Sequence, residues 1–429
     1  MNILFISGEL IGADLARRLM EEGANVKLYI DNIELRNCFD GIINKTLDWR
    51  VEIDWVGKEG LIIFDDVGFG KDIDKLRLDG YRVIGAGQEG ERLELDRVHG
   101  QHILKKYGVV SDEFETISLS IKDAIDFVIK HPDEWVVKQN DHNTALNYIG
   151  SLADASDVIA VMNSYRNIFG DDCSISLQKR VRGVEIAIGR FFNGNDWASP
   201  SVINFEHKHL CNDDIGPLGG ETGTLMWYEN NEKNKLYTQT LEKIKPHLIE
   251  IGYKGYIDLN CIVNENKIYP LEFTCRFGSS TIETQVEIHN SRWSDFMLNL
   301  ASGEKFKLEY SEGYAVNVAI TVPPFPYRTT DKSIINDNAV IFFKNDVLNG
   351  NSKHIHFEGV KKYKDNYLTS GNLGYVFYIT SINRDIELSR KYIYQIIDNI
   401  LISKMFYRTD IATRFIRKDS ELLKKWGWI

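Results

Sequence analysis

The sequence predicts a mixed α/β chain of several domains that opens with a Rossmann-type domain. Three observations carry that prediction: a length of 429 residues, an apolar content of 43%, and short apolar runs that alternate with helical patterns near the N-terminus. At roughly 100 to 200 residues per domain, this length allows two to four domains. Strands that alternate with helices indicate a parallel sheet with covered faces.

Residues 1–92 contain the elements of such a parallel sheet. Asn2–Ser7 is a short apolar run, and Gly8 and a helical pattern that ends at Gly23 follow it. Three later runs are short, apolar and closed by Gly or Asp, which is typical of buried strands. These runs are 26–30, 60–65 and 81–85.

Residues 93–322 are expected to form a larger domain with strands and helices in mixed order. Ser120 begins one helix, with Asp123 at the capping-box position. Two strand patterns flank Asn264-Glu265-Asn266 and predict a β-hairpin. The expected strands are 134–139, 174–179, 185–192, 255–263 and 268–274, and the other expected helices are 92–106, 155–168 and 232–251.

A small C-terminal domain is expected over residues 323–429. Pro323-Pro324-Phe325-Pro326 holds three of the eight prolines, which is typical of a linker. Two strand-like runs, 340–343 and 375–380, and a helical pattern over 386–401 follow it.

The charge balance argues against polyanionic macromolecules as partners. The chain has 51 Lys and Arg residues against 62 Asp and Glu, a formal net charge of −11. Nucleic acids and anionic membranes need an excess of positive charge on one face of the protein. We therefore expect small-molecule partners, with a nucleic-acid binder as the least favoured class, and a monomer or homodimer.

Cysteine usage and hydropathy indicate a reducing compartment. The cysteines are odd in number and form no Cys-x-x-Cys pair, so they do not make a closed disulfide framework. The apolar N-terminal run is too short for a signal peptide, and no run of about 18 apolar residues predicts a membrane span. We therefore expect a cytoplasmic protein. The five cysteines are Cys38, Cys173, Cys211, Cys261 and Cys275.

Two carboxylates on the predicted hairpin form the first candidate site. Asp258 and Glu272 lie on adjacent antiparallel strands, where alternation can place both side chains on one face. Both lie among apolar residues, where an unpaired carboxylate is costly, and a hard cation such as Mg²⁺ would offset that cost. Hydrogen bonds from Arg276 or the backbone would also do so, and the spacing alone favours this structural role.

The segment around Glu272 resembles a known family. Leu271-Glu272-Phe273-Thr274-Cys275-Arg276-Phe277-Gly278, followed by Glu283-Thr284-Gln285, is similar to the Glu-Phe-Asn-Cys-Arg-Phe-Gly and Glu-Thr-Gln signature of the phosphoribosylamine-glycine ligases, members of the ATP-grasp superfamily. Further segments match the family in the same order along the chain. They are Val83-Ile84-Gly85 with Leu93 to Arg97, His207-Lys208 with Gly216-Pro217 and Gly219-Gly220, Thr369-Ser370-Gly371-Asn372, and Tyr407-Arg408-Thr409-Asp410-Ile411.

The resemblance implies an ATP-grasp fold after the N-terminal domain and a carboxylate-amine ligase activity. In this family ATP phosphorylates a carboxylate to an acyl phosphate, and an amine then attacks the acyl carbon to give an amide, ADP and phosphate. Such chemistry needs cations over the phosphates, a Mg²⁺ or Mn²⁺ ion and a stabiliser for the oxyanion. Glycine or another small amino acid is the expected carboxylate.

Individual roles are carried over from the family motifs position by position. The resemblance places Arg276 beside the transferring phosphoryl group as the catalytic residue. Glu272 is the implied metal ligand, with Thr274 in place of the family's Asn and Asp258 as a compensating ligand. The implied ATP contacts are Arg97, Lys138, Gln178, Val181 and Glu185, and the implied substrate contacts are Lys208, Gly219, Gly220, Arg408 and Asp410.

These roles have structural alternatives. Lys138 can extend from a strand to solvent, and Glu185 can be an outward residue of an alternating strand. Arg276 can serve as a structural partner of Glu272 or Asp258.

A zinc site is an alternative for the run His207-Lys208-His209. The two imidazoles would share one strand face, but no third ligand is evident in the sequence.

One departure from the family weakens the expected ATP site. The family's Gly-Lys-Gly loop over the phosphates is replaced by Asp141-His142-Asn143-Thr144-Ala145-Leu146-Asn147, whose backbone cannot wrap a triphosphate in the same way. A catalytically silent nucleotide-binding relative is therefore an alternative. The joint presence of the other motif residues argues against it.

Other departures lie on the amine side. The family's phosphate-binding Gly-Asn-Gly-Gly-Arg-Glu-His corresponds to Ser7-Gly8-Glu9-Leu10-Ile11-Gly12-Ala13-Asp14, where Glu9 would repel a phosphate although a helix N-terminus remains. Asp65 and Asp66 replace a Gly-Pro-Glu-Ala-Pro stretch, and Ser279-Ser280-Thr281-Ile282 lengthens a substrate loop. We predict that the acyl-phosphate chemistry is retained with a changed amine acceptor. The first alternative is a genuine phosphoribosylamine-glycine ligase of purine biosynthesis.

Overall fold

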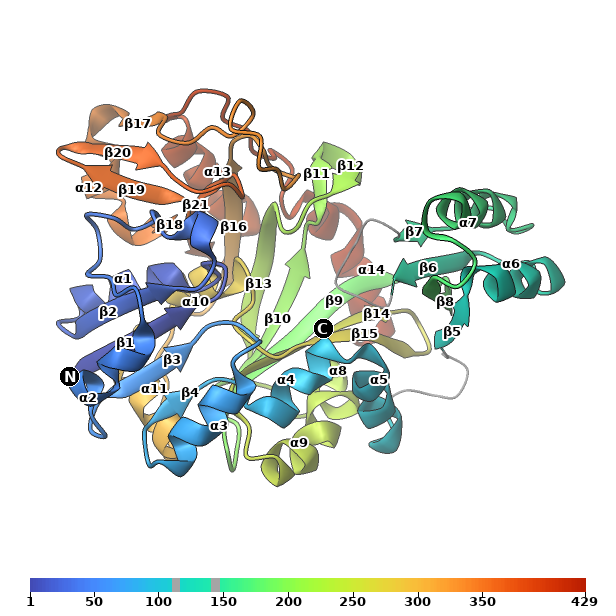
Figure 1. The fold of residues 1–429 in the computed structure, drawn as a ribbon, viewed down its shortest axis with the longest axis horizontal. Helices are drawn as coiled ribbons and strands as arrows, with labels where there is room; N and C mark the ends of the chain where they lie inside the picture. Colours follow the sequence, from blue (N-terminus) through green and yellow to red (C-terminus); the bar gives the residue numbers. More distant parts are fainter. Residues whose placement is uncertain (110–115, 140–146) are drawn as a thin grey trace.

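The N-terminal residues form a four-stranded parallel sheet in the order β2-β1-β3-β4 (Figure 1). The computed structural model describes residues 1–109, 116–139 and 147–429. Residues Ile3 to Ile6 are completely buried, as expected for a parallel strand covered on both faces. The Rossmann-type prediction is confirmed. The elements are β1 (Asn2–Ser7), α1 (Ala13–Glu21), β2 (Asn25–Ile30), α2 (Ile53–Val56), β3 (Leu61–Phe64), α3 (Gly70–Leu78) and β4 (Val83–Ile84).

Two helices replace the single helix predicted over 92–106. They are α4 (Gln88–Leu95) and α5 (Arg97–Lys106), and Asp96 between them leaves the helical region at φ −110° and ψ 89°. The Asp96 side chain accepts a hydrogen bond from the N–H of His99 (3.0 Å), which caps α5. Arg97 is therefore the first residue of a capped helix.

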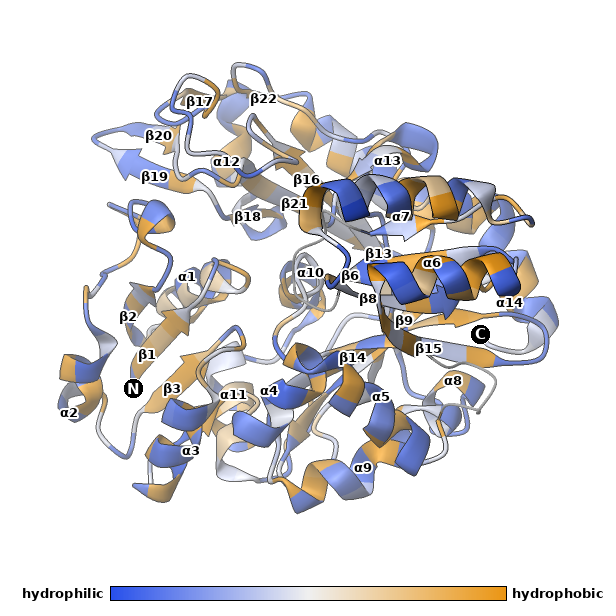
Figure 2. Cartoon of the chain, turned by 45° about the vertical axis from the view of Figure 1, so that its right-hand side comes forward, coloured by the Kyte–Doolittle hydropathy of each residue, from blue (hydrophilic) through white to orange (hydrophobic). Residues whose placement is uncertain are grey.

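A small antiparallel sheet, β5-β8-β6-β7, lies at one end of the molecule with α6 and α7 on one face (Figure 1). Figure 2 shows hydrophobic and hydrophilic stripes along both helices. Val137 is completely buried beneath them, so the next residue of the strand, Lys138, faces the opposite side. The elements are β5 (Thr116–Ser120), α6 (Ile121–Lys130), β6 (Trp135–Gln139), β7 (Tyr148–Ile149), α7 (Ser156–Phe169) and β8 (Ser174–Lys179).

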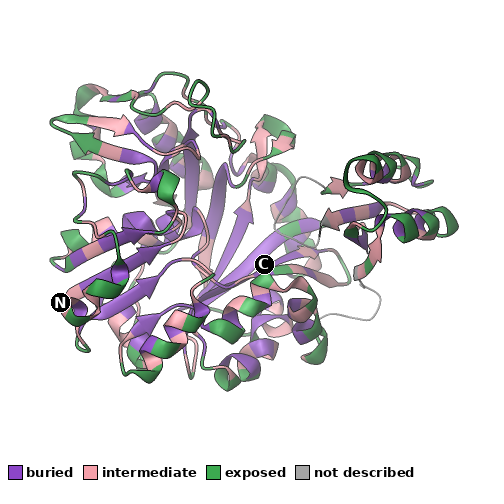
Figure 3. Ribbon diagram, viewed as in Figure 1, coloured by how far each residue is buried: buried purple, intermediate pink, exposed green. Residues whose placement is uncertain are grey.

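An eight-stranded antiparallel sheet, β15-β14-β9-β10-β13-β16-β21-β18, forms the centre of the molecule. Most of its strand residues are buried, as the purple strands of Figure 3 show. The sheet contains strands from both sides of residue 322, where the C-terminal domain was predicted to begin. The predicted domain boundaries at residues 92 and 322 remain predictions. The strands are β9 (Val184–Asn193), β10 (Ser201–Glu206), β13 (Gly223–Glu229), β14 (Lys254–Val263), β15 (Ile268–Thr274), β16 (Tyr314–Thr321), β18 (Ile355–Phe357) and β21 (Tyr375–Asn383).

Helices α9 (Leu241–Glu250), α10 (Thr281–Ile288) and α11 (Trp293–Ser302) pack against this sheet, and α8 (Lys235–Gln239) packs against α9. The single helix predicted over 232–251 is wrong, because Thr240 leaves the helical region at φ −127° and ψ −93° and separates α8 from α9. The predicted hairpin is confirmed, since β14 and β15 pair directly across the Asn264 turn.

The C-terminal region adds a third four-stranded sheet, β19-β20-β17-β22, and a two-stranded hairpin, β11-β12, follows β10 along the chain. The predicted helix over 386–401 ends at Ile397, and residues 400–401 pair with β17 instead. None of the helices in the described part of the chain is long and apolar enough to cross a bilayer. The elements are β11 (His209–Cys211), β12 (Ile215–Leu218), β17 (Val340–Phe343), α12 (Val347–Gly350), β19 (Val360–Tyr363), β20 (Asn366–Thr369), α13 (Ile386–Ile397), β22 (Ile400–Leu401) and α14 (Ser420–Trp426).

Candidate active site

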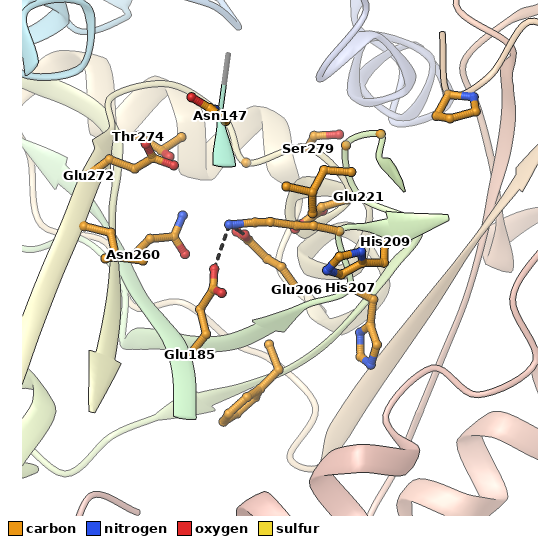
Figure 4. A pocket seen from close by; sticks show the side chains of 18 of the residues that line it. Asn147, Glu185, Glu206, His207, His209, Glu221, Asn260, Glu272, Thr274 and Ser279 are labelled. Atoms are coloured by element: carbon orange, nitrogen blue, oxygen red, sulfur yellow. Dashed lines mark hydrogen bonds and ion pairs between the residues drawn. The ribbon is translucent and has the colours of Figure 1, made fainter. Parts of the chain in front are cut away.

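A cleft of about 720 Å³ lies between the small sheet, the central sheet and the N-terminal domain (Figure 4). Residues from every part of the fold line it, including the linker at 325–328. Many of the predicted site residues meet there. They are Arg97, Lys138, Glu185, Lys208, Gly219, Gly220, Glu272, Thr274 and Arg276.

The hairpin of β14 and β15 supplies one wall of the cleft. Thr274 pairs with Asp258 and Glu272 pairs with Asn260, so these four side chains share one face of the sheet. Asn260 was missed in the sequence, although it follows Asp258 by two residues and therefore points the same way.

Glu272 is ionised in this setting. Its carboxylate accepts a hydrogen bond from the Arg97 guanidinium (Nη2 to Oε2, 2.8 Å). Burial alone would raise the pKa of Glu272, but the positive charges of Lys208, Arg97 and Lys138 lower it below its ordinary value.

Asp258 lies behind the cleft wall and does not line the cavity. Its Oδ2 accepts hydrogen bonds from the Tyr256 hydroxyl (3.0 Å) and the Asn204 amide (3.2 Å). Burial, together with the negative charge of Glu206, raises the pKa of Asp258 to about 7. Its partners are therefore neutral side chains, whereas we expected Arg276 or backbone groups.

Positive charge gathers at this end of the cleft. Lys208 donates to Glu185 (2.8 Å) and forms an ion pair with Glu206 (2.9 Å). Lys138 forms no ion pair with a described residue, and burial and the nearby charge of Arg97 lower its pKa to about 8. An uncompensated, partly buried ammonium favours an anionic ligand.

Glu185 reaches the cleft by strand alternation. Its neighbours Val184 and Ile186 are buried in the central sheet, so Glu185 faces the cavity. It is the partner of Lys208 in this structure, as the dashed line in Figure 4 shows.

Arg276 turns toward the N-terminal domain. Its Nε donates to Glu94 on α4 (3.1 Å) and lies 3.6 Å from Oδ1 of Asp66. Its Nη1 donates to the carbonyl of Phe277 (2.9 Å). The predicted alternative partners were Glu272 and Asp258; Arg276 instead connects the cleft to the segment after β3.

A protein carboxylate occupies the loop that precedes α1. Asp65 accepts hydrogen bonds from the N–H groups of Gly8 (3.1 Å) and Gly12 (2.9 Å) and from the Ser7 hydroxyl (2.6 Å). A Cβ atom at Gly12 would lie 2.7 Å from the ring of Phe277, so only glycine fits there. Two of the backbone donors that we expected to remain available for an anion, those of Gly8 and Gly12, are therefore already used.

Glu9 is also neutralised. Arg328 donates to its two carboxylate oxygens at 2.8 and 2.5 Å. The side-chain hydrogen bonds and the charge of Arg328 lower the pKa of Glu9, so the pair brings no net charge to the cleft. No local sequence pattern indicates this pair, because the two residues lie on distant segments of the chain.

The glycines Gly219 and Gly220 permit close packing at the cleft mouth. A Cβ at Gly219 would lie 2.2 Å from Pro326, and the Tyr375 hydroxyl donates to the carbonyl of Gly219 (3.4 Å). The motif thus brings the proline-rich linker against the cleft.

Two predicted substrate contacts lie outside the cleft lining. Arg408 is 1% exposed and donates to both carboxylate oxygens of Asp410 at 2.8 Å. It also bonds Asp214 (3.0 Å) and the carbonyl of His209 (3.0 Å), which anchors the β11–β12 hairpin. Arg408 and Asp410 therefore hold the β11–β12 hairpin in position and do not line the cavity.

Two predicted nucleotide contacts also lie outside the main cleft. Gln178 is buried within β8, where it pairs with Val136. Val181 lines a smaller cavity of about 570 Å³, which shares Arg414 and Asp419 with the main cleft. Of the substituted phosphate loop, Asn147 lines the cleft, whereas residues 141–146 lie outside the described residues.

The zinc alternative at His207 and His209 finds no support. The Nε2 atom of His207 accepts from the N–H of Ala412 (3.2 Å), and His209 Nδ1 bonds the carbonyl of Gly216 (2.9 Å). Within residues 1–109, 116–139 and 147–429, no three His, Cys, Asp or Glu side chains are grouped to hold a metal.

Comparisons with known proteins agree with this geometry. A family model described as phosphoribosylglycinamide synthetase, ATP-grasp (A) domain, matches residues 96–282. The phosphoribosylamine-glycine ligase of Lactococcus lactis subsp. lactis is 23% identical over 342 residues, 78% of each chain. That of Helicobacter pylori (strain ATCC 700392 / 26695) is 21% identical over 441 residues, 97% of each chain.

A solved structure shows the same fold over the whole chain. The crystal structure of phosphoribosylamine-glycine ligase from Thermotoga maritima superposes with a TM-score of 0.71 at 18% identity, and the match covers 96% of this chain and 100% of that one. Residues 96–282 thus match the ATP-grasp domain of phosphoribosylglycinamide synthetase, the chain is similar along most of its length to phosphoribosylamine-glycine ligases, and it is an ATP-grasp ligase that forms carbon–nitrogen bonds.

Proposed function

We propose that this ligase joins a small amino acid such as glycine to an amine that carries no phosphate group. The observation that carries the proposal is Asp65, whose carboxylate takes the Gly8 and Gly12 N–H groups at the start of α1. An N-terminal loop of this kind is otherwise a natural phosphate site, because its free N–H groups and the helix dipole favour an anion. With Asp65 in place, two N–H groups of the loop are already engaged. Burial and the charge of Asp66 raise the pKa of Asp65 to about 7, so it is partly ionised at neutral pH and would repel a phosphate.

The opposite end of the cleft supports ATP binding. Lys138 is without a counter-charge among the described residues, and Arg97 and Lys208 lie close enough to lower its pKa. Phosphate oxygens would supply the missing negative charge. We assign Arg97, Lys138 and Lys208 to the phosphates and Glu185 to the ribose.

The chemistry of the hairpin fits a hard divalent cation. Glu272 is ionised, and the oxygens of Asn260 and Thr274 lie on the same sheet face. Glu272 and Asn260 would hold Mg²⁺ or Mn²⁺ together with phosphate oxygens, and the ion would screen the charge of the phosphates. Asp258 and Thr274 are the weaker candidates, because Asp258 is held behind the cavity wall by Tyr256 and Asn204.

The reaction balances as two transfers. The terminal phosphoryl group of ATP passes to a carboxylate oxygen of the amino acid, and ADP leaves. The amine nitrogen then forms a bond to the acyl carbon while the bond from that carbon to the phosphate oxygen breaks, and phosphate and a proton leave. Arg276 lines the cleft between the two ends and would stabilise the negative charge on the transferring group.

Release of ADP from Mg-ATP, measured with glycine and a matrix of amines, tests the proposal. Phosphate-free amines should stimulate turnover, and phosphoribosylamine should not. Turnover with phosphoribosylamine alone would identify a genuine phosphoribosylamine-glycine ligase and refute the changed acceptor. The absence of any stabilisation of the protein by millimolar Mg-ATP in a thermal-shift assay would refute the enzyme itself.

A further inference from the structure

The part of the cleft lined by Glu9, Arg328 and Tyr375 is here called the acceptor end. Two buried glutamates at this end form no ion pair with a described cation. Glu221 is 8% exposed and Glu358 is 6% exposed, and both line the cavity. Neither forms an ion pair with a described Lys, Arg or His residue. The other lining glutamates are each paired: Glu9 with Arg328, Glu185 and Glu206 with Lys208, and Glu272 with Arg97.

Glu221 presents an unused oxygen atom. Its Oε2 accepts a hydrogen bond from the Ser280 hydroxyl, whereas its buried Oε1 has no hydrogen-bond partner. In the view of Figure 4, Glu221 and Ser279 lie on the opposite side of the cleft from Glu272 and Thr274. This oxygen therefore belongs to the acceptor end rather than to the hairpin that would hold the metal.

Glu358 reaches the same end from the C-terminal region, directly after β18. Charged and titratable groups surround it on several segments. They are Glu9, Cys38, Asp65 after β3, Glu283 on α10, and Tyr375 and Tyr378 on β21.

Aromatic rings complete this part of the wall. The rings of Phe325 and Tyr375 lie 4.7 Å apart, and those of Tyr375 and Tyr378 lie 5.9 Å apart. Gly220, the neighbour of Glu221, lies so close to Tyr375 that a Cβ there would be 2.5 Å from the tyrosine hydroxyl, and the N–H of Glu358 donates to the carbonyl of Val376 (3.0 Å). Both glutamates therefore lie beside Tyr375. A cation over an aromatic face and beside carboxylates is strongly stabilised when water is excluded.

In the absence of a ligand, protons substitute for this missing cation. Burial and the negative charge of Glu206 raise the pKa of Glu221 well above its ordinary value. Burial raises the pKa of Glu358 to about 8. A bound ammonium would replace these protons and leave both groups as carboxylates.

We infer that the amine substrate carries a second amino group, protonated at neutral pH, which Glu221 and Glu358 hold beside Tyr375. The inference rests on the proposed function and names its acceptor class: a phosphate-free molecule with two amino groups. One amino group is anchored at this subsite, and the other reaches the acyl carbon.

Calorimetric titration of the full chain with 1,4-diaminobutane at pH 8 tests the subsite without ATP. Glu221→Gln and Glu358→Gln should each weaken binding at least tenfold, whereas Glu312→Gln should not change it. Glu312 is an exposed residue outside the cleft, so its variant changes the net charge equally. Thermal unfolding of each variant checks that it folds, and equal affinities in all four proteins would overturn the subsite.

Turnover with matched amines separates this inference from the proposed function. With Mg-ATP and glycine, 1,4-diaminobutane should give at least a tenfold higher kcat/KM than butylamine, and Glu221→Gln should bring the ratio of the two values close to one. Equal use of both amines, unaffected by Glu221→Gln, would overturn the subsite and leave the ligase intact. Diamine binding that depends on Glu221, with no ADP release for any amine, would overturn the ligase and the acceptor role together.

Discussion

The two ends of the cleft have opposite charge deficits. At the hairpin end, Glu185 and Glu272 are neutralised by Lys208 and Arg97, and Lys138 forms no ion pair with any carboxylate of the described residues. At the acceptor end, the buried side chains of Glu221 and Glu358 form no ion pair with a cation in the described part of the chain. The difference shows how one cavity can bind both an anionic and a cationic ligand. The hairpin end has an excess positive charge that ATP would balance, and the acceptor end has carboxyl groups that an ammonium group would balance.

The loss of Glu272 should have the largest effect. Glu272→Ala removes the one ionised carboxylate of the hairpin wall, so kcat for ADP release should fall at least ~100-fold. Titration of Mg²⁺ in the assay should show that the remaining activity needs more metal. Glu265→Ala is the matched control, since Glu265 is an exposed residue of the same hairpin turn. Full activity of Glu272→Ala would refute its role as a ligand.

Removal of the unpaired ammonium should have the next largest effect. Lys138→Met keeps the length of the side chain but removes its charge, so the affinity for ATP should fall roughly 10- to 150-fold, the value of a charge-assisted hydrogen bond. The shift in Tm with rising Mg-ATP measures this loss. Lys179→Met serves as the control, because Lys179 is exposed on β8 and pairs with Asp133. Equal shifts in both variants would show that the hairpin end does not bind phosphates.

The hydrogen bonds from the Gly8 and Gly12 N–H groups to Asp65 can be tested by measuring protein stability. At pH 6, Asp65→Ala leaves the Gly8 and Gly12 N–H groups without acceptors, which should lower the free energy of unfolding by about 1–3 kcal/mol. Inorganic phosphate should restore part of this loss, since an anion can then enter the loop. Denaturant titrations with and without phosphate measure both effects. Asp72→Ala, which breaks a surface ion pair with Arg50, should cost less than about 1 kcal/mol.

A failure of phosphate to stabilise Asp65→Ala would mean that the loop has lost the capacity to bind an anion. The acceptor end would then differ from the family by more than this one carboxylate.

The last and most gradual expected effect is a pH dependence at Glu358. The folded chain holds the proton of Glu358 up to a pKa of about 8, whereas the ordinary pKa of a glutamate is 4.5. The unfolded state loses this proton first, so the contribution of Glu358 to the free energy of unfolding falls as the pH rises between about 4.5 and 8. Glu358→Gln removes this slope, which is at most about 1.4 kcal/mol per pH unit. Parallel curves for the two proteins, measured by denaturant unfolding, would contradict the raised pKa.

The elements that the sequence predicted well are those fixed by local patterns. The hairpin of β14 and β15 follows from strand alternation around an Asn-rich turn, and its side chains then share a face by necessity. The helix breaks at Asp96 and Thr240 were missed because neither position carries Gly or Pro. Neither the extension of the central sheet beyond residue 322 nor its strand order could be predicted, since long-range pairing leaves no local pattern.

The candidate site divides in the same way. Motif positions such as Lys138 and Glu272 converge on the cleft, and strand alternation alone could have identified Asn260. A motif does not reveal which side chain turns inward, so Arg408 was expected at the substrate but is buried with Asp410. Glu221 and Glu358 come from distant segments, and only the assembled fold brings them to one cavity.

The Asp65 carboxylate acts as an internal ligand, and this changes when the loop before α1 becomes ordered. A loop that waits for a substrate phosphate is ordered during binding, and the lost freedom is subtracted from affinity. Here the donors of Gly8 and Gly12 are satisfied as soon as the chain folds. The conformational entropy of the loop is therefore lost during folding and not during binding. An incoming acceptor meets a loop that already has its final conformation.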